Sequence, residues 1–189
     1  MHTRILIVLL LLFLLMPSPV QSAGLSSLPP IETGFTLGYG KGNIHEGDYN
    51  PILLSLNIGA DLSQWLNFLK GHEGRLSIFA EPQFNPVRDS SDYEFGIGIG
   101  LKYMYPINNN LSLFILGSVG WHYITVVTAD QSNEFIFADA IGAGFTYLFN
   151  GNMGLSLGYR YRHLSNCDIR EPNGGINNHF GTLGYSYFF

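Results

Sequence analysis

Bulky apolar residues recur at every second position along most of this chain, and short runs rich in Gly, Asn, Pro and Ser separate the alternating stretches. A period of two is the pattern of a β-strand whose two faces meet different surroundings. In the clearest stretch, 95–105, aromatic and aliphatic residues alternate with Gly and Lys. The pattern predicts eight strands, at Thr33–Tyr39, Ile52–Leu62, Arg75–Asn85, Phe95–Tyr105, Leu111–Val126, Glu134–Phe149, Met153–Ser165 and Asn177–Phe189.

The two faces of these strands indicate the surroundings of the fold. The bulky faces are too large to share one small core, but all of them can meet lipid, and about ten residues suffice for a tilted membrane strand. The opposite faces carry Gly, Ser, Thr and charged residues, which suit a narrow lumen. We therefore predict an all-β fold, an eight-stranded antiparallel transmembrane β-barrel of the outer membrane, with a soluble antiparallel sandwich as the alternative. An even strand count places both termini on the periplasmic side.

Both ends of the chain point to export. Arg4 precedes an apolar run of twelve residues, too short to span a bilayer, and Pro17 ends that run. This predicts a cleaved signal peptide over residues 1–22 and one β-barrel domain over 23–189. The last strand ends on the terminal aromatic Phe189 and resembles the signature read by the barrel-insertion machinery of bacteria. The predicted location is the bacterial cell outer membrane, with the insertion machinery and the surrounding membrane lipid as partners.

Composition narrows the function further. The net charge is −5 without a basic stripe, which argues against a nucleic-acid partner, and the single Cys167 excludes an internal disulfide. Eight strands close around an interior that side chains fill, which argues against transport. Charged residues on the inner faces are expected to pair there, namely Asp61, Glu81, Lys102, Arg160 and Arg162. The segment Leu62–Gly74 is expected to hold a short interfacial turn of helix.

The stretch Met153–Ser165 carries the candidate chemistry. Tyr159 and Tyr161 are expected to face lipid, and His163 and Ser165 continue the same parity toward the membrane rim. Residues i and i+2 on one face of a strand lie side by side, so an imidazole can approach a hydroxyl. Such a pair provides the base and the nucleophile of ester hydrolysis. The simpler interpretation is a polar rim where the strand leaves the hydrocarbon.

Two runs and the final aromatic strand extend this motif: His163-Leu164-Ser165-Asn166 and Pro172-Asn173-Gly174-Gly175-Ile176. Together they resemble the lipid A 3-O-deacylase family, called PagL, whose members are eight-stranded outer-membrane barrels. The resemblance implies a serine esterase that removes the 3-O-linked acyl chain from lipid A of lipopolysaccharide. It implies Ser165 as nucleophile, His163 as base and the backbone N–H of Asn166 in the oxyanion hole. No cofactor is implied, and no metal-ligand cluster is visible in the sequence.

The third catalytic residue is where this chain departs from the family. The family's acid falls on Asn177, which can still orient an imidazole by accepting a hydrogen bond, and Asp168 stands where Gly is expected. Asp139 is the alternative acid, because its parity turns it outward and counting from the turn near 151 places it opposite His163 or Ser165. An interfacial carboxylate is the simpler role for Asp139. Glu171 is a weaker candidate, and His122 and His179 are expected to be structural.

Two other functions stay open at this point. One is a non-enzymatic small outer-membrane barrel that acts in adhesion or envelope stability. The other is a related esterase that acts on phospholipid. The discriminating observation is whether His163 and Ser165 lie together on the outer wall.

Overall fold

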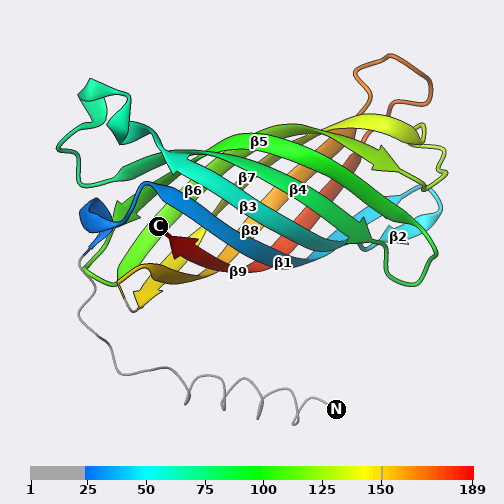
Figure 1. Ribbon diagram of the computed structural model, residues 1–189. Helices are drawn as coiled ribbons and strands as arrows, with labels where there is room; N and C mark the ends of the chain where they lie inside the picture. Colours follow the sequence, from blue (N-terminus) through cyan, green and yellow to red (C-terminus); the bar gives the residue numbers. More distant parts are fainter. Residues whose placement is uncertain (1–23, 150) are drawn as a thin grey trace, which may run out of the picture.

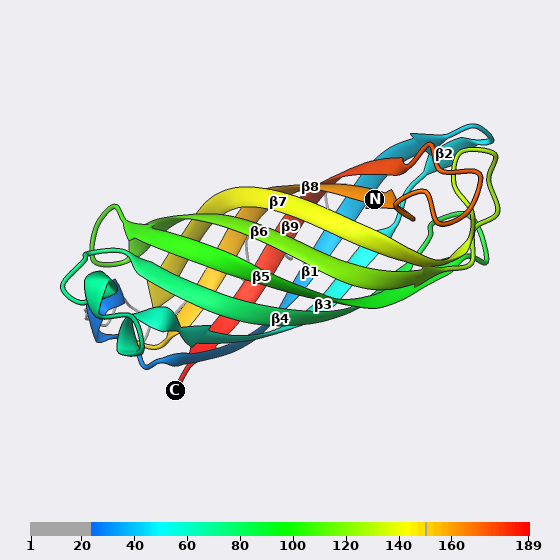
Figure 2. The same cartoon turned by 90° about the horizontal axis from the view of Figure 1, so that it is seen from above.

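The computed structural model describes residues 24–149 and 151–189, which form a closed antiparallel β-barrel (Figures 1 and 2). Consecutive long strands pair with one another, and β1 closes the barrel on β9. The eight barrel strands are β1 (Ile31–Ile44), β3 (Ile52–Asp61), β4 (Arg75–Pro86), β5 (Tyr93–Pro106), β6 (Leu111–Ile124), β7 (Glu134–Phe149), β8 (Met153–Ser165) and β9 (Ile176–Phe188). The eight-stranded antiparallel barrel is therefore confirmed. The predicted signal peptide, 1–22, lies outside the described residues.

A short additional strand, β2 (Gly47–Tyr49), pairs with the end of β1. It lies at the end of the barrel that also carries the loops 87–92, 125–133 and 166–175, which we call the loop end (Figure 1). The opposite end carries the first described residues and the C-terminus and is called the terminal end. The loop after β3 lies there and contains two 3₁₀ turns, η2 (Leu62–Gln64) and η3 (Asn67–Leu69), while η1 (Leu25–Ser27) precedes β1. This agrees with the helical turn predicted within Leu62–Gly74.

No helix in the described part of the chain is long and apolar enough to cross a membrane.

β1 and β5 extend furthest beyond their predicted bounds, whereas β4 and β9 each extend one residue beyond theirs. β1 continues through Lys41 to Ile44, where apolar alternation ends because Lys41 and Asn43 take the outward positions and Gly40 and Gly42 the buried ones. A Cβ on Gly40 would lie 2.5 Å from the Phe180 ring, and one on Gly42 would lie 2.4 Å from a backbone oxygen of β9. β5 starts two residues earlier than predicted, and it includes Glu94, which alternates with the outward Phe95 and points into the lumen.

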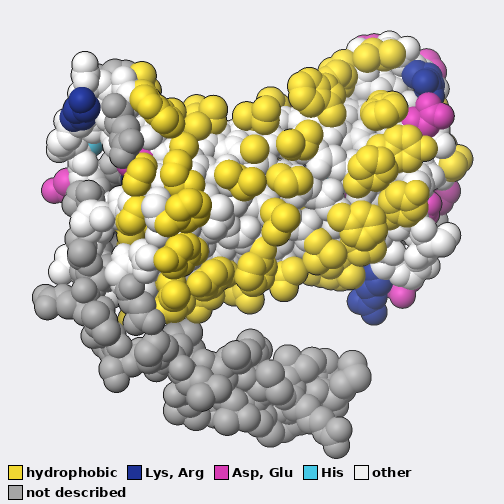
Figure 3. All heavy atoms as spheres, viewed as in Figure 1, with side chains coloured by type: hydrophobic (Ala, Val, Ile, Leu, Met, Phe, Trp, Pro, Cys, Tyr) yellow, Lys and Arg dark blue, Asp and Glu magenta, His cyan; other side chains and the backbone are white. Residues whose placement is uncertain are grey.

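The outer wall is apolar over the middle of the barrel, and charged side chains gather at its two ends (Figure 3). Aromatic rings form a continuous row near the loop end, with centroids of successive members 5.3–6.4 Å apart: Phe84, Tyr93, Phe95, Tyr123 and Phe135. An apolar band bordered by aromatic side chains is typical of outer-membrane barrels. The bulky faces of the strands therefore point outward, as their alternation predicted.

The lumen is filled by ion pairs. Arg160 donates to both carboxylate oxygens of Glu81 at 2.8 and 2.9 Å, and Arg162 donates to both oxygens of Glu94. Lys102 pairs with Glu32, and Arg75 lies 3.4 Å from Asp61. All five residues predicted to pair inside do so. Their partners Glu32, Glu94 and Arg75 escaped prediction, and Glu32 and Glu94 did so because they lie directly before the predicted starts of their strands.

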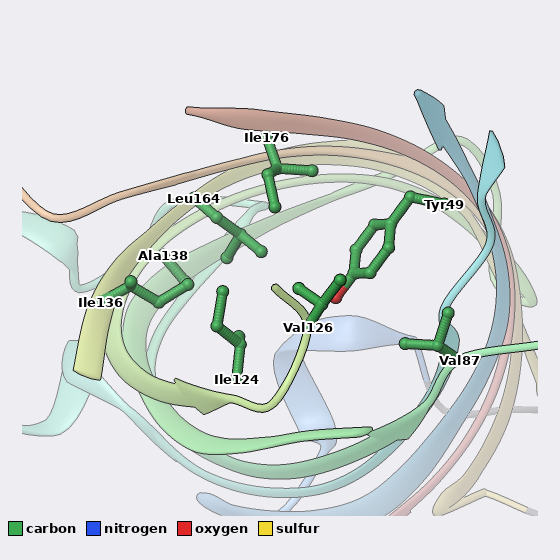
Figure 4. Close-up of a cluster of buried hydrophobic side chains, with 8 residues drawn as sticks. All are labelled: Tyr49, Val87, Ile124, Val126, Ile136, Ala138, Leu164 and Ile176. Atoms are coloured by element: carbon green, nitrogen blue, oxygen red, sulfur yellow. The ribbon is translucent and has the colours of Figure 1, made fainter. Parts of the chain in front are cut away.

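Apolar clusters close the lumen at each end. At the loop end eight buried side chains converge inside the ring of strands, as Figure 4 shows: Tyr49, Val87, Ile124, Val126, Ile136, Ala138, Leu164 and Ile176. At the terminal end Leu25, Leu28, Met104, Phe114, Leu148 and Phe188 do the same. A cavity of about 60 Å³ beside Lys102 and Arg160 has room for a few water molecules. A filled interior of this kind does not support transport of solutes.

Candidate functional site

The last residues of β8 bring His163 and Ser165 onto the outer wall at the loop end. Their neighbours Arg162 and Leu164 are buried in the lumen, whereas His163 and Ser165 are partly exposed on the other face of the strand. The strand alternation therefore places an imidazole and a hydroxyl side by side toward the membrane, two positions apart. This is the arrangement that separates an outer-wall esterase from a barrel that acts only through its loops.

The buried side of this strand segment is held rigidly. Besides its two bonds to Glu94, the Arg162 guanidinium donates to Asn178 Oδ1 at 2.8 Å and lies 5.0 Å from the centre of the Phe180 ring. Glu94 also accepts from Asn85 and from the hydroxyl of Tyr49. These contacts come from β2, β4, β5, β8 and β9, so the network fixes the backbone directly beneath the exposed pair.

Asn177 holds the imidazole from the neighbouring strand. β8 and β9 pair in a register that sets His163 opposite Asn177, and His163 Nδ1 lies 2.8 Å from Asn177 Oδ1. An amide oxygen only accepts hydrogen bonds, so Nδ1 carries the proton and Nε2 presents its lone pair. Within the described residues neither Nε2 nor the Ser165 hydroxyl has a hydrogen-bond partner, and both are therefore available to a ligand or to each other.

Gly175 supports the other side of the ring. Its φ of +79° is in the left-handed region that favours glycine. A Cβ at this position would lie 2.5 Å from Cε1 and 3.1 Å from Nε2 of His163. Both features explain the glycine that precedes β9, because any side chain would displace the imidazole.

Asp139 lies where the counting of residues placed it. β7 and β8 pair with Asp139 opposite His163, and its side chain is exposed on the outer wall. No hydrogen bond or ion pair joins Asp139 to His163 among the described residues. Of the two candidate partners that flank the imidazole, Asn177 therefore makes the contact with Nδ1.

The hydrogen bonds of Asn166 differ from those expected of an oxyanion-hole residue. Its backbone N–H, the predicted oxyanion donor, donates to Asn173 Oδ1 at 2.8 Å. Its side chain is buried and donates to Ser132 Oγ at 2.6 Å and to the backbone oxygen of Arg170. Asn173 is in turn held by the carboxylate of Asp168 at 2.7 Å. An oxyanion reaches this N–H only if the Asn173 side chain moves away.

The other candidates lie apart from this pair. His122 is buried in the lumen, with Nδ1 3.9 Å from Glu94, and Glu171 is exposed on the loop after β8. His179 lies on the outer wall, where its Nδ1 is hydrogen-bonded to the hydroxyl of Tyr159. The described residues contain no group of three or more His, Cys, Asp or Glu side chains suited to a metal ion.

Sequence reasoning missed two residues that contact the site. Tyr161 was taken as a lipid-facing side chain, but its hydroxyl also donates to Asn177 Oδ1 at 2.6 Å. Its position two residues before His163 was a usable signal, because diagonal neighbours on paired strands are within reach of a long side chain. Asn173 was part of the quoted motif, but nothing in the sequence indicated that its side chain would accept from Asn166.

An apolar hollow lies on the outer wall next to Asp139, the residue that pairs with His163 across β7 and β8. It has a volume of about 810 Å³, and Asp139 lies at its end toward the loops. The hollow exists because Gly117 and Ala143 replace bulky residues between Ile115, Val119 and Ile141. Its surface is almost entirely apolar, which suits a hydrocarbon chain.

Comparisons with known proteins identify a family and a fold. A family model described as Lipid A 3-O-deacylase (PagL) matches residues 52–186, more than half of the chain. The search of curated proteins found no match.

Solved structures share the fold. The outer membrane enzyme PagL is similar at 21% identity and a TM-score of 0.55, over 80% of this chain and 98% of that chain. Neisserial surface protein A is similar at 13% identity and a TM-score of 0.61, over 84% and 97%. Ail, the attachment invasion locus protein of Yersinia pestis, is similar at 16% identity and a TM-score of 0.52, over 85% and 97%.

Proposed function

Because this chain belongs to the lipid A 3-O-deacylase (PagL) family, we propose that it is a serine esterase that removes the 3-O-linked acyl chain of lipid A. The family makes it an ester hydrolase of the bacterial outer membrane with lipid A as substrate. The proposal adds the serine chemistry and the position of the bond. It rests on one observation above all, the outward-facing pair of His163 and Ser165 with Nδ1 of His163 held by Asn177.

In the proposed reaction, Ser165 Oγ attacks the carbonyl carbon of the ester while Nε2 of His163 takes the hydroxyl proton. The tetrahedral intermediate collapses, and the imidazolium returns the proton to the sugar oxygen that leaves. Water then attacks the acyl-serine with His163 again as base. This step releases a free fatty acid and restores Ser165, so the net change is hydrolysis of one ester bond.

The oxyanion of this intermediate needs a donor near Ser165. The backbone N–H of Asn166 follows the nucleophile directly and suits this role, provided that the carbonyl oxygen of the substrate displaces Asn173 Oδ1. One charge-assisted hydrogen bond then replaces a neutral one, which favours the displacement as negative charge develops.

The outer wall offers the substrate a direct approach. The pair lies at the loop end, opposite the termini, which corresponds to the outer leaflet if both termini face the periplasm. Lipid A has its sugars at the membrane surface and its acyl chains in the hydrocarbon. The apolar hollow bordered by Asp139 can take an acyl chain, and Asp139 pairs with His163 across β7 and β8.

The proposal is tested by incubating the purified protein in detergent with lipid A and, separately, with a diacyl phospholipid, and by measuring released fatty acid. Release from lipid A alone is expected. Equal or faster release from the phospholipid would contradict the assignment of substrate and favour an esterase for phospholipid. No release from either would reject the esterase.

The hydrogen bond between Asn177 Oδ1 and His163 Nδ1 predicts that Asn177, and not Asp139, orients the imidazole. Asn177→Ala should lower kcat about 10-fold or more, because the imidazole loses the acceptor that fixes its proton. Asp139→Asn keeps that bond, so its effect on kcat should be smaller. Measuring kcat for both variants on lipid A decides between the two residues. A larger loss for Asp139→Asn would assign the orienting role to Asp139 instead.

Recognition by the barrel-insertion machinery remains a proposal, based on the terminal aromatic residue. The Phe189 backbone closes the seam with Ile31 through hydrogen bonds of 2.9 and 3.1 Å, but its side chain is exposed. Phe189→Ala should therefore lower the yield in the outer membrane of cells and leave refolding in detergent unchanged. Trp65→Ala, which removes an exposed aromatic from a loop, serves as the control. An unchanged outer-membrane yield of Phe189→Ala would contradict the proposed recognition.

A further inference from the structure

The side-chain amide of Asn177 has an oxygen end and an NH₂ end of similar shape. Only the oxygen end prepares His163 for the proposed chemistry. With the amide oxygen toward Nδ1, the imidazole carries its proton on Nδ1 and offers Nε2 to Ser165. With the amide NH₂ toward Nδ1, the proton moves to Nε2, and the imidazole no longer accepts the serine proton. In serine proteases, replacing the Asp that orients the catalytic histidine by Asn produces the wrong tautomer of the imidazole and lowers kcat about 10⁴-fold. The direction of this amide therefore decides whether the site has a base.

Tyr161 makes a second contact with the same amide oxygen. Its hydroxyl donates to Asn177 Oδ1 at 2.6 Å, next to the 2.8 Å bond from His163 Nδ1. The register of β8 and β9 explains the contact, since His163 lies opposite Asn177, and Tyr161 lies one pair further along on the same face. A phenol ring is long enough to bridge this diagonal.

The chemistry of the phenol favours the productive direction of the amide. A phenol hydroxyl is a good donor, but its oxygen is a poor acceptor because its lone pairs are delocalised into the ring. Turning the Asn177 amide would exchange a strong bond from the phenol to the amide oxygen for a weak bond from NH₂ to the phenol oxygen. The Tyr161 hydroxyl therefore penalises the turned amide.

The phenol is itself held in place. Its ring centroid lies 5.3 Å from that of His179, and His179 Nδ1 is hydrogen-bonded to the Tyr159 hydroxyl. Tyr159, His179 and Tyr161 thus form a row on the outer wall that ends at Asn177. Among the described residues no hydrogen bond joins this row directly to His163 or Ser165.

We propose that Tyr161 is a positioning residue, whose hydroxyl holds the Asn177 amide oxygen toward His163 and thereby fixes the Nδ1–H tautomer. The inference rests on the proposed serine esterase function. It also predicts when Tyr161 becomes dispensable. A carboxylate at position 177 has two equivalent oxygens and no donor end, so nothing then needs to select its direction.

The kinetic test compares Tyr161→Phe in two backgrounds. In the native background the exchange should lower kcat for lipid A about five- to tenfold, with KM unchanged, because one orienting hydrogen bond is lost. In an Asn177→Asp background the same exchange should change kcat less than about twofold. Equal losses in both backgrounds would overturn the inference, as would an unchanged kcat in the native background.

The tautomer itself is measurable without substrate, by ¹⁵N NMR of histidine-labelled protein in detergent, with His163→Gln to assign the signal. His163 should be mainly Nδ1–H in the native protein and a mixture of both tautomers in Tyr161→Phe. The control Tyr159→Phe should alter His179 and leave His163 unchanged, because it removes a hydroxyl of the same row that does not contact Asn177. A native Nε2–H tautomer, or an unchanged His163 in Tyr161→Phe, would overturn the inference. This NMR measurement requires no turnover. If the native protein had no activity, the proposed function would be rejected, but the effect of Tyr161 on the His163 tautomer could still be determined.

Discussion

Ser165→Ala is expected to lower kcat for lipid A by about 10³-fold or more, with the barrel fully folded. The hydroxyl is partly exposed on the outer wall and has no hydrogen-bond partner among the described residues, so its removal should not disturb the fold. His163→Ala should cause a loss of similar size. The double variant should be no worse than either single variant, because nucleophile and base act as one unit.

The measurement is fatty-acid release from lipid A, with heat-modifiable gel mobility as the check that each barrel is folded. Ser90→Ala, on an exposed loop at the same end of the barrel, is the matched control and should retain native activity. A folded Ser165→Ala enzyme with more than about a tenth of native activity would exclude Ser165 as the nucleophile.

The second large effect concerns stability. Glu94 is fully buried and accepts from Arg162, Asn85 and the hydroxyl of Tyr49. Glu94→Ala leaves the Arg162 guanidinium buried without its carboxylate, which should lower the free energy of unfolding by about 3–5 kcal/mol. Urea unfolding of the barrel in lipid vesicles measures this loss.

The control for Glu94 is an exposed ion pair at the same end of the barrel. Glu134 lies 2.8 Å from Arg170, and both side chains are about half exposed, so Glu134→Ala should cost less than about 1 kcal/mol. Similar losses for Glu94→Ala and Glu134→Ala would contradict the view that the buried network fixes the backbone beneath His163.

Much of the barrel followed from alternation alone, because lipid on one side and a narrow lumen on the other impose opposite demands on neighbouring residues. β7 and β8 have the predicted bounds for this reason. The continuation of β1 beyond Tyr39 escaped prediction, since Gly40 and Gly42 carry no hydrophobic signal and pack closely against the paired strand β9. The short β2 escaped for a similar reason, because three residues are too few to show a period.

The candidate site, like the barrel, could be predicted from the sequence only in part. Parity placed His163, Ser165, Asp139 and Asn177 on the outer wall, and register counting placed Asp139 opposite His163. The choice between Asp139 and Asn177 as the partner of Nδ1 required side-chain geometry, because both flank the imidazole on paired strands. The engagement of Asn166 by Asn173 depends on the path of the loop after β8, which no local periodicity encodes.

Mass spectrometry of lipid A after incubation with the purified protein tests the central claim most directly. The account predicts that the native protein removes one acyl chain, that fragmentation places the new free hydroxyl at position 3 of the sugar, and that Ser165→Ala leaves the lipid A mass unchanged. Unaltered lipid A with the folded native protein, a free hydroxyl at another position, or the same product from Ser165→Ala would contradict it.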